Sequence, residues 1–377
     1  SGFHTFSLRF ADAEYDEGPY QQLMSRALGT EHHEVVVERA DIAAVFPEVV
    51  RLAERPILRT APAPMFLLSR LVREHGIKVV LTGEGADEMF AGYDLFREGA
   101  VRRFWARAPG STQRPRLLEK LYPYLARSPV AQRAIAEQFF GQKLERWREP
   151  GFAHETRWRT TASLQRLLQP EVRAVAGQAV ASLLADLPAE FANWTHLAQD
   201  QWLEIKTLMS GYLLSAQGDR MLMGNSVEGR FPFLDREVMA LAQSLPASYK
   251  LRGLDEKHVL KRLGNSLIPA EILRRPKQPY RAPDALAFVA PNGQAVAPWV
   301  DDMMSPAVAE AAGVFVPAAV GQLWAKCKNR SAAQFSNSDN MAVVGVLSTH
   351  LLWQHFVGQP PALRPIDAIR TDIERQI

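Results

Sequence analysis

The sequence predicts an α/β fold with a parallel doubly wound sheet, followed by a mainly helical C-terminal half. Two observations carry this prediction. Up to about residue 95, short β-branched runs alternate with helical segments of about ten residues, the pattern of a parallel sheet with crossover helices. Beyond that point the strand signals fade, and Trp202, Ile205, Leu208, Met209 and Tyr212 recur at helical spacing.

The expected elements of the first part follow in order. Apolar alternation and helical periodicity predict strands at 4–10, 34–37 and 77–81, and helices at 20–28 and 65–74. Gly29 directly follows the first helix, as a C-terminal cap should. Ligands of parallel sheets bind at the carboxyl ends of strands, so Ser7-Leu8 and Thr82-Gly83 would lie at a binding site.

Composition excludes several classes of protein. The 377 residues are 47% hydrophobic and 23% charged, as in an ordinary globular protein. No apolar run approaches the roughly 18 residues of a membrane span, and no signal-peptide pattern is visible. Cys327 is the only cysteine, which excludes a disulfide framework, a cysteine-based zinc site and a CxxC redox pair. A cytoplasmic protein is expected.

The segment Lys78 to Tyr93, KVVLTGEGADEMFAGY, carries the strongest local signal. The order of residues predicts a buried strand, a glycine turn and a helix that begins with acidic residues. The glycines let the backbone approach a ligand closely, and the N–H groups at the helix start favour a phosphate. A carboxylate beside the phosphate would be placed to bind Mg²⁺. The segment is not a Walker A loop, because no Gly-Lys-Ser/Thr follows. The alternative is a tight turn that needs glycine for its geometry alone.

The segment 97–166 is basic, with 15 Lys/Arg against 6 Asp/Glu. Interleaved aromatic residues would suit a nucleic-acid surface. Basic residues at helical spacing more often form a solvated helix face, and that interpretation is preferred here. A basic flank could also attract an anionic substrate.

Four other polar features stand out in the sequence. Among residues 218–235, a structural ion-pair network is expected for Asp219, Arg220 and Asp235. Prolines stiffen the loop 274–283, where a fixed Lys277 would suit charge balance on a phosphate. Residues 336–340 form a good helix N-cap. His32 and His33 should point to opposite faces of a strand and not share a metal.

Taken together, these segments resemble the synthetase domain of the glutamine-dependent asparagine synthetases and their amidotransferase relatives. The resemblance runs from Thr5 to about Val357. It rests on ordered blocks at 5–10 (TFSLRF), 14–17 (EYDE), 28–34 (LGTEHHE), 79–93 (VVLTGEGADEMFAGY), 219–235 (DRMLMGNSVEGRFPFLD), 274–283 (RRPKQPYRAP) and 337–349 (NSDNMAVVGVLST).

The resemblance implies an ATP pyrophosphatase fold of the adenine-nucleotide alpha-hydrolase type, with ATP and Mg²⁺. A carboxylate would attack the α-phosphate of ATP, and ammonia would then displace AMP from the acyl-adenylate. The implied site residues are Ser7, Leu8, Thr82 and Gly83 for the nucleotide, Glu84 for adenylation, Asp87 for Mg²⁺ and Lys277 for charge neutralisation, with Glu228 and Arg230 in support.

Departures from the family pattern set further expectations. The serine- and glycine-rich pyrophosphate loop and the glutaminase domain with its first-position cysteine have no match here. Residues 1–95 are therefore expected to be a nucleotide-binding part without that loop, 96–200 a basic helical insert, and 201–377 the helical remainder. A glutaminase domain or chain is expected to supply ammonia.

The substrate is left open. The sequence does not decide between aspartate and another small carboxylic acid that is amidated in the biosynthesis of natural products, including antibiotics. A third alternative is ring closure, which some members of the family carry out. A non-catalytic scaffold subunit is the alternative outside enzymes. Neither nucleic acid nor membrane is an expected partner, and a homodimer is left open.

Overall fold

The structure, a computed structural model, describes residues 2–12, 15–122, 133–275, 280–329, 335–360 and 362. Its N-terminal part alternates as expected. The strands and helices there are β1 (His4–Phe10), α1 (Gly18–Leu28), β2 (Glu31–Val37), α2 (Arg39–Ala53), α3 (Pro62–Glu74), β3 (Val79–Leu81) and α4 (Ala86–Met89). Gly29 ends α1 in the left-handed conformation, with φ of 63°. The predicted strands and helices of this part are therefore confirmed, with shifted ends. The prediction of a buried strand before the glycine turn is wrong, because Val79 and Leu81 of β3 are 40% and 73% exposed.

The sheet is smaller than predicted. β1 pairs in parallel with β2, from His4 opposite Glu31 to Phe10 opposite Val37. β3 pairs in parallel with β4 (Glu228–Arg230). Within the described residues these are two separate two-stranded sheets, so the parallel direction is confirmed but one doubly wound sheet is not shown.

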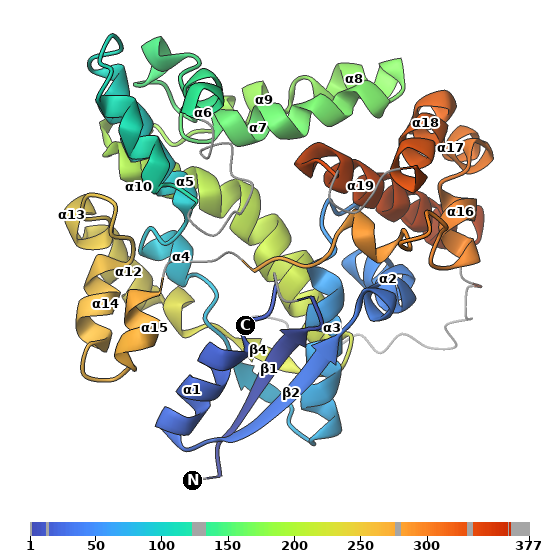
Figure 1. The fold of residues 1–377 in the computed structure, drawn as a ribbon, viewed down its shortest axis with the longest axis horizontal. Coiled ribbons are helices and arrows are strands. Elements are labelled where there is room, and N and C mark those ends of the chain that lie inside the picture. Colours follow the sequence, from blue (N-terminus) through green and yellow to red (C-terminus); the bar gives the residue numbers. More distant parts are fainter. Residues whose placement is uncertain are drawn as a thin grey trace, which may run out of the picture.

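The rest of the described chain is mainly helical, as expected (Figure 1). The upper lobe in the figure contains α5 (Asp94–Ala106), η1 (Arg114–Lys120), α6 (Arg133–Phe140), η3 (Leu144–Arg146), α7 (Glu155–Ala162), η4 (Ser163–Leu167), α8 (Pro170–Ala176), α9 (Ala179–Ala185), η5 (Phe191–Asn193) and α10 (His196–Glu204). From α10 the chain continues through a π-helix, η6 (Ile205–Asp219), into α11 (Arg220–Met223). This continuous helical segment joins the lobe to the strands.

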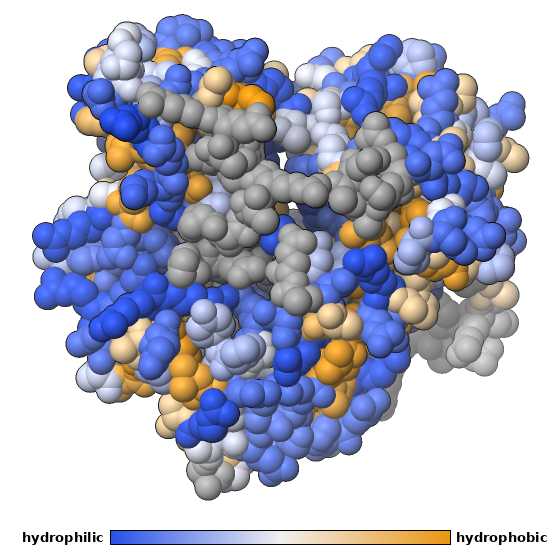
Figure 2. Space-filling model, viewed as in Figure 1, coloured by the Kyte–Doolittle hydropathy of each residue, from blue (hydrophilic) through white to orange (hydrophobic). Residues whose placement is uncertain are grey.

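Two further groups of helices flank the strands (Figure 1). One group lies beside α4 and comprises η7 (Pro232–Leu234), α12 (Arg236–Ser244), α13 (Ala247–Lys250), α14 (His258–Gly264) and α15 (Ala270–Arg274). The other comprises η8 (Ala285–Ala287), α16 (Pro298–Met303), α17 (Pro306–Ala312), α18 (Pro317–Lys328), α19 (Asn337–Trp353) and η10 (Gln354–Gly358). The face shown in Figure 2 is mostly hydrophilic, with apolar residues in scattered small groups.

The main hydrophobic core lies between α2, α19 and the segment around Phe288. Phe46 of α2 and Phe288 are fully buried and contact edge-to-face at 4.9 Å between ring centroids. Ser336 and Asp339 form the expected capping box at the start of α19. The helical stretch Asn337–Gly358 is long and apolar enough to cross a membrane by length and composition alone, and 56% of its apolar window is buried inside the protein. Its packing against α2, α16, α17 and α18 accounts for that composition.

The basic segment differs from its expected role as a solvated face. The side chains of Arg102 and Arg103 in α5 are 1% and 9% exposed. Arg102 donates to the carbonyl oxygens of Phe140 and Phe152, and Arg103 forms a bidentate pair with Asp200. These two cations hold the helical lobe together, so the solvated-face interpretation is wrong for them.

Candidate active site

The turn between β3 and α4 has a backbone that only glycine suits at one position. Gly85 precedes α4 with φ of 91°, a conformation that side chains rarely adopt. A Cβ added to Gly85 would lie 2.3 Å from Leu234 Cδ2. Gly83, in contrast, has open space around it, so its backbone can be approached from outside.

Thr82 presents a polar group into this turn. Its N–H donates to the carbonyl oxygen of Arg230 at 3.0 Å, which extends the β3–β4 ladder by one residue. Its hydroxyl is buried and, among the described residues, has no hydrogen-bond partner. A buried hydroxyl without a partner is costly, and a ligand at the turn would relieve that cost.

Asp87 lies in the first turn of α4 and pairs with a lysine from a distant segment. Lys257 Nζ lies 2.9 Å from Asp87 Oδ1, with the two side chains 24% and 15% exposed. Gly92 makes room for this pair, because a Cβ there would lie 2.0 Å from Asp87 Oδ1 and 2.3 Å from Lys257 Cε. The arrangement places one cation and one carboxylate beside the glycine turn.

Lys257 was missed by the sequence analysis. It has φ of 50° just before α14, and its N–H donates to the carbonyl oxygen of Phe90 at 3.2 Å. Those contacts fix its position across 170 residues of sequence from Asp87. The local sequence, DEKHVLK, gives no sign of this pairing, since lysines near a helix start are common on surfaces.

The other two acidic residues of this segment occupy different environments. Glu84 is half-buried in the turn. Glu88 is 1% exposed and accepts a hydrogen bond from the Tyr93 hydroxyl at 2.8 Å. Burial raises the pKa of Glu88 to about 7, against a smaller opposite effect of the Tyr93 hydrogen bond. Glu88 can therefore hold a proton near neutral pH beside the salt bridge of Asp87 and Lys257.

At the carboxyl end of β1, the backbone of Leu8 already has one partner. Its carbonyl oxygen accepts a hydrogen bond from Gln21 Nε2 at 3.0 Å. A small cavity of about 60 Å³ lies here, lined by Leu8, Phe10, Tyr15, Glu17, Gln21, Tyr280 and Arg281. Ser7 is half-buried and alternates with Leu8 along the strand.

A common packing layer relates the two strands that carry these residues. Phe6 of β1 and Val80 of β3 pack into one hydrophobic cluster with Val72 of α3 and Leu222 of α11.

The cavity at β1 is much smaller than the roughly 300–1,000 Å³ of small-molecule sites. Binding of a nucleotide there would require side chains to move.

A larger cavity of about 250 Å³ lies in the helical lobe, between α5 and α10. Of its charged lining residues, Arg103 and Asp200 are already paired with each other, and Arg107 lies over the ring of Trp147 at 5.7 Å from the centroid. Because these charged groups already have partners, they are less available to bind a ligand than the polar groups at the turn after β3. We therefore take the turn after β3 as the candidate site.

The other charged residues that the sequence singled out form ion pairs, cap a helix, are exposed or lie outside the described residues. Lys277 is outside the described residues. Glu228 and Arg230 pair with each other at 2.8 Å on β4, and both side chains are exposed. Arg220 pairs with Glu54 at 2.7 Å, and Asp235 caps α12 through backbone N–H groups. The expected ion-pair role is therefore confirmed for Arg220 alone; Asp235 is a helix cap instead, and Asp219 is exposed.

Comparison with known proteins gives a consistent result. The sequence profile described as "Asparagine synthase" matches residues 1–355. A Mycobacterium tuberculosis protein with the provisional name asparagine synthetase (glutamine-hydrolysing) is 30% identical over 290 residues, which are 74% of this chain and 41% of that protein. Asparagine synthetase 1 (glutamine-hydrolysing) of Bacillus subtilis is 24% identical, covering 74% and 42%. Amidase chyE of Penicillium rubens is 26% identical, covering 75% and 44%. The chain thus spans about two fifths of the length of these relatives.

Proposed function

Because the chain belongs to the asparagine synthase family, we propose that it performs the synthetase half of an ATP-dependent, AMP-forming amide synthesis. A carboxylate oxygen of the substrate attacks the α-phosphorus, and the bond to the bridging oxygen breaks with loss of pyrophosphate. The nitrogen of ammonia then attacks the acyl carbon. The carbon–oxygen bond to AMP breaks, AMP leaves with the electron pair, and a proton passes from nitrogen to solvent.

The arrangement around the turn after β3 is the observation that carries this proposal. Thr82 offers a hydroxyl that has no hydrogen-bond partner in the described part of the chain, Gly83 offers an open backbone, and Lys257 provides a cation held 2.9 Å from a carboxylate. In the proposal Thr82 and Gly83 contact the nucleotide together with Ser7 and Leu8. The positive charge of Lys257 offsets charge on the phosphates, which is the main task that such a reaction leaves to the protein.

Asp87 is the proposed holder of Mg²⁺. Its carboxylate is partly exposed at the start of α4, and one or two carboxylates plus substrate phosphates are the usual ligands of this ion. When bound, Mg²⁺ would neutralise charge on the departing pyrophosphate. Glu84 is proposed to support adenylation, and Lys277 to balance charge during adenylation or amide formation.

The source of ammonia, the location of the protein and the acid substrate are further parts of the proposed function. Two of the relatives are named glutamine-hydrolysing, and the chain spans only part of their length. We therefore propose that a glutaminase domain or chain delivers ammonia to this part, in the cytoplasm. Aspartate is the first candidate for the acid.

A second candidate acid class is favoured by two fungal relatives that are named amidases. Their names do not specify aspartate, so we extend the proposal to other acids. Under this alternative the activation step is unchanged, and only the pocket for the acid differs.

The test is ATP–pyrophosphate exchange by the full-length protein with ammonia supplied and candidate acids screened one by one. Lys257→Ala and Asp87→Asn should each lower the exchange rate by about 100-fold or more, as expected when a preorganised charge contact is lost. Lys261→Ala is the matched control, since Lys261 lies one helical turn away and pairs with Asp255 and Glu256. Wild-type rates in Lys257→Ala would refute the site, and no exchange with any acid would favour the scaffold alternative.

A further inference from the structure

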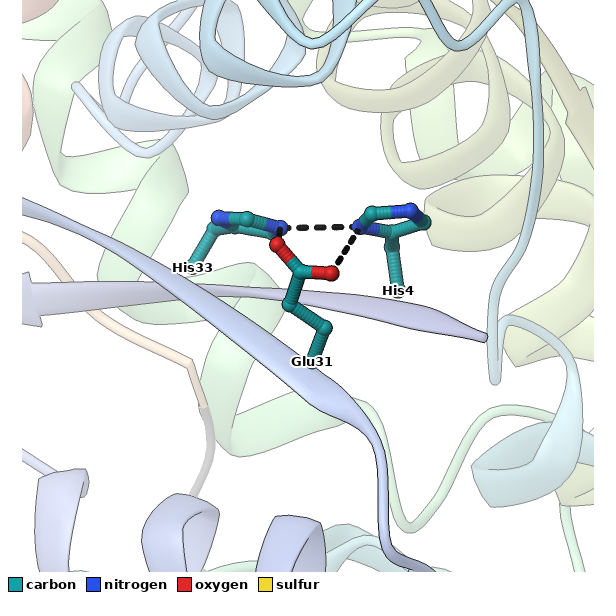
Figure 3. A group of neighbouring side chains, drawn as sticks. All are labelled: His4, Glu31 and His33. Carbon is teal, nitrogen blue, oxygen red and sulfur yellow. Dashed lines mark hydrogen bonds and ion pairs between the residues drawn. The ribbon is translucent and has the colours of Figure 1, made fainter. Parts of the chain in front are cut away.

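Three side chains with metal-binding atoms converge at the amino ends of β1 and β2 (Figure 3). His4 Nδ1 lies 2.9 Å from His33 Nε2. Glu31 reaches both imidazoles, with its carboxylate oxygens 3.8 Å from His4 Nδ1 and 3.6 Å from His33 Nε2. We propose that His4, Glu31 and His33 form a binding site for a divalent transition metal of the zinc type.

Strand register explains why these residues meet. In the parallel pair, His4 lies opposite Glu31 and Phe6 opposite His33. Side chains alternate between the faces of a strand, so Glu31 and His33 share a face with His4. His32 points to the other face, where its Nδ1 lies 2.9 Å from the Thr5 hydroxyl. The expectation that His32 and His33 point to opposite faces of the strand is therefore confirmed, and His33 contacts His4 of β1 and Glu31 instead.

The distances between the donor atoms suit a tetrahedral ion. Nitrogen and oxygen ligands lie about 2.0–2.2 Å from zinc, which places two ligands of a tetrahedron about 3.3–3.6 Å apart. The two nitrogens lie 2.9 Å apart, and they face different oxygens of Glu31, at 3.8 Å from His4 and 3.6 Å from His33. One ligand atom from each of the three residues lies within 4.8 Å of the other two, close to the spacing that a tetrahedral ion requires. Two histidines and a glutamate leave a fourth position for water. Imidazole ligands favour Zn²⁺, Co²⁺ or Ni²⁺ over Mg²⁺ and Ca²⁺.

The surroundings prepare His33 as a ligand. Its ring lies 4.0 Å from the ring of His75 and 5.0 Å from that of Phe6, which restricts its orientation.

The site is separate from the proposed adenylation site. His4 begins β1, whereas Leu8 lies four residues further along, about 13 Å for an extended strand. Metal binding would cross-link β1 to β2 at one end of their ladder. A ligand that binds only the folded chain stabilises it, so the consequence is structural and independent of adenylation.

The experiment is a calorimetric titration of the full chain with Zn²⁺ after chelator treatment, with the absorption spectrum of the Co²⁺ form as a second readout. Wild type should bind one Zn²⁺, unaffected by excess Mg²⁺, and give the intense visible bands of tetrahedral Co²⁺. His33→Ala should weaken Zn²⁺ binding by about 100-fold, since even outer partners of metal ligands contribute about 10- to 100-fold.

His32→Ala is the matched control, because it removes the same side chain from the adjacent position on the opposite face. It should bind Zn²⁺ within about threefold of wild type. His4→Ala, at a more exposed position, repeats the test if His33→Ala folds poorly. The proposal is overturned if wild type binds no stoichiometric Zn²⁺, or if His32→Ala weakens binding as much as the ligand variants do.

Discussion

Asp87 and Glu88 are neighbours in sequence, yet their carboxyl groups lie in opposite electrostatic environments. Asp87 has the ammonium group of Lys257 at 2.9 Å. Glu88 is buried beside Tyr93, with no cation among the groups that shift its pKa. One helix of four residues thus supplies an ionised carboxylate and a carboxyl group that keeps its proton up to about pH 7.

Glu88 should make stability fall as pH rises. The unfolded chain releases this proton near pH 4.5, whereas the folded chain holds it to about pH 7, so the folded state binds more protons in between. We expect a loss of up to roughly 3 kcal/mol between pH 4.5 and 8, measured by urea unfolding. Glu88→Gln should remove this part of the pH dependence. The exposed control Glu74→Gln should keep it, and an unchanged slope in Glu88→Gln would contradict the assignment.

Gly92→Ala should separate Asp87 from Lys257. The added methyl group would overlap both side chains, so we expect a loss of about 1–3 kcal/mol in stability and a lower rate of ATP–pyrophosphate exchange. Gly177→Ala is the control, because its new methyl group would have only ordinary contacts at 3.5 Å or more in a helical backbone. Thermal unfolding and exchange assays on both variants provide the measurement; equal effects would argue against a role for Gly92 at the site.

Of the residues at this site, some could be predicted from the sequence and others could not. Asp87 could be named because a glycine turn and a carboxylate lie within one local pattern. Lys257 could not, because its pairing with Asp87 depends on tertiary packing and on a left-handed backbone that no local signal marks. The environment of Glu88 likewise depends on burial by distant elements.

At the scale of elements, α5 and α10 are joined by buried charges. Arg103 and Asp200 form two hydrogen bonds of 2.5 and 2.9 Å, and their side chains are 9% and 2% exposed. Further along the same helix, Glu204 contacts His154 and Arg157. Burial would raise the pKa of Glu204, but Arg157 and His154 outweigh it and lower the pKa to about 2.

Arg103→Met should destabilise the lobe by about 3–5 kcal/mol, because it leaves the carboxylate of Asp200 buried without its cation. The double variant Arg103→Met/Asp200→Leu should recover most of that loss, since two apolar side chains of similar size can pack in the same space. Chemical unfolding of the single and double variants gives the coupling energy. A double variant no more stable than Arg103→Met would contradict this account.

Helices and strands with regular patterns were predictable, but special helices were not. The capped ends of α1 and α19 follow from Gly29 and from the Ser336–Asp339 box. The π-helix η6 replaces the α-helical face expected from Trp202 to Tyr212, because its hydrogen bonds span five residues instead of four. Apolar residues at spacings of three and four do not distinguish the two.

For the whole molecule, the sequence predicted parallel strands and a helical second half but not the arrangement of the sheet. Alternation of strands with helices implies the parallel direction. The pairing of β3 with β4 joins segments almost 150 residues apart, and Glu228–Arg230 is too short and too charged to signal a strand. Long-range pairing of this kind depends on the packed fold.

The division into two small sheets also leaves strand edges at which other chains could associate. Among the described residues, β1 and β3 each have one side whose backbone N–H and C=O groups pair with no strand. Such open edges are templates for intermolecular strand addition and aggregation. Leu81, 73% exposed, lies on β3 directly before Thr82. The strand that leads to the candidate site therefore has an unpaired edge, so protection of this edge and access to the site depend on the same few residues.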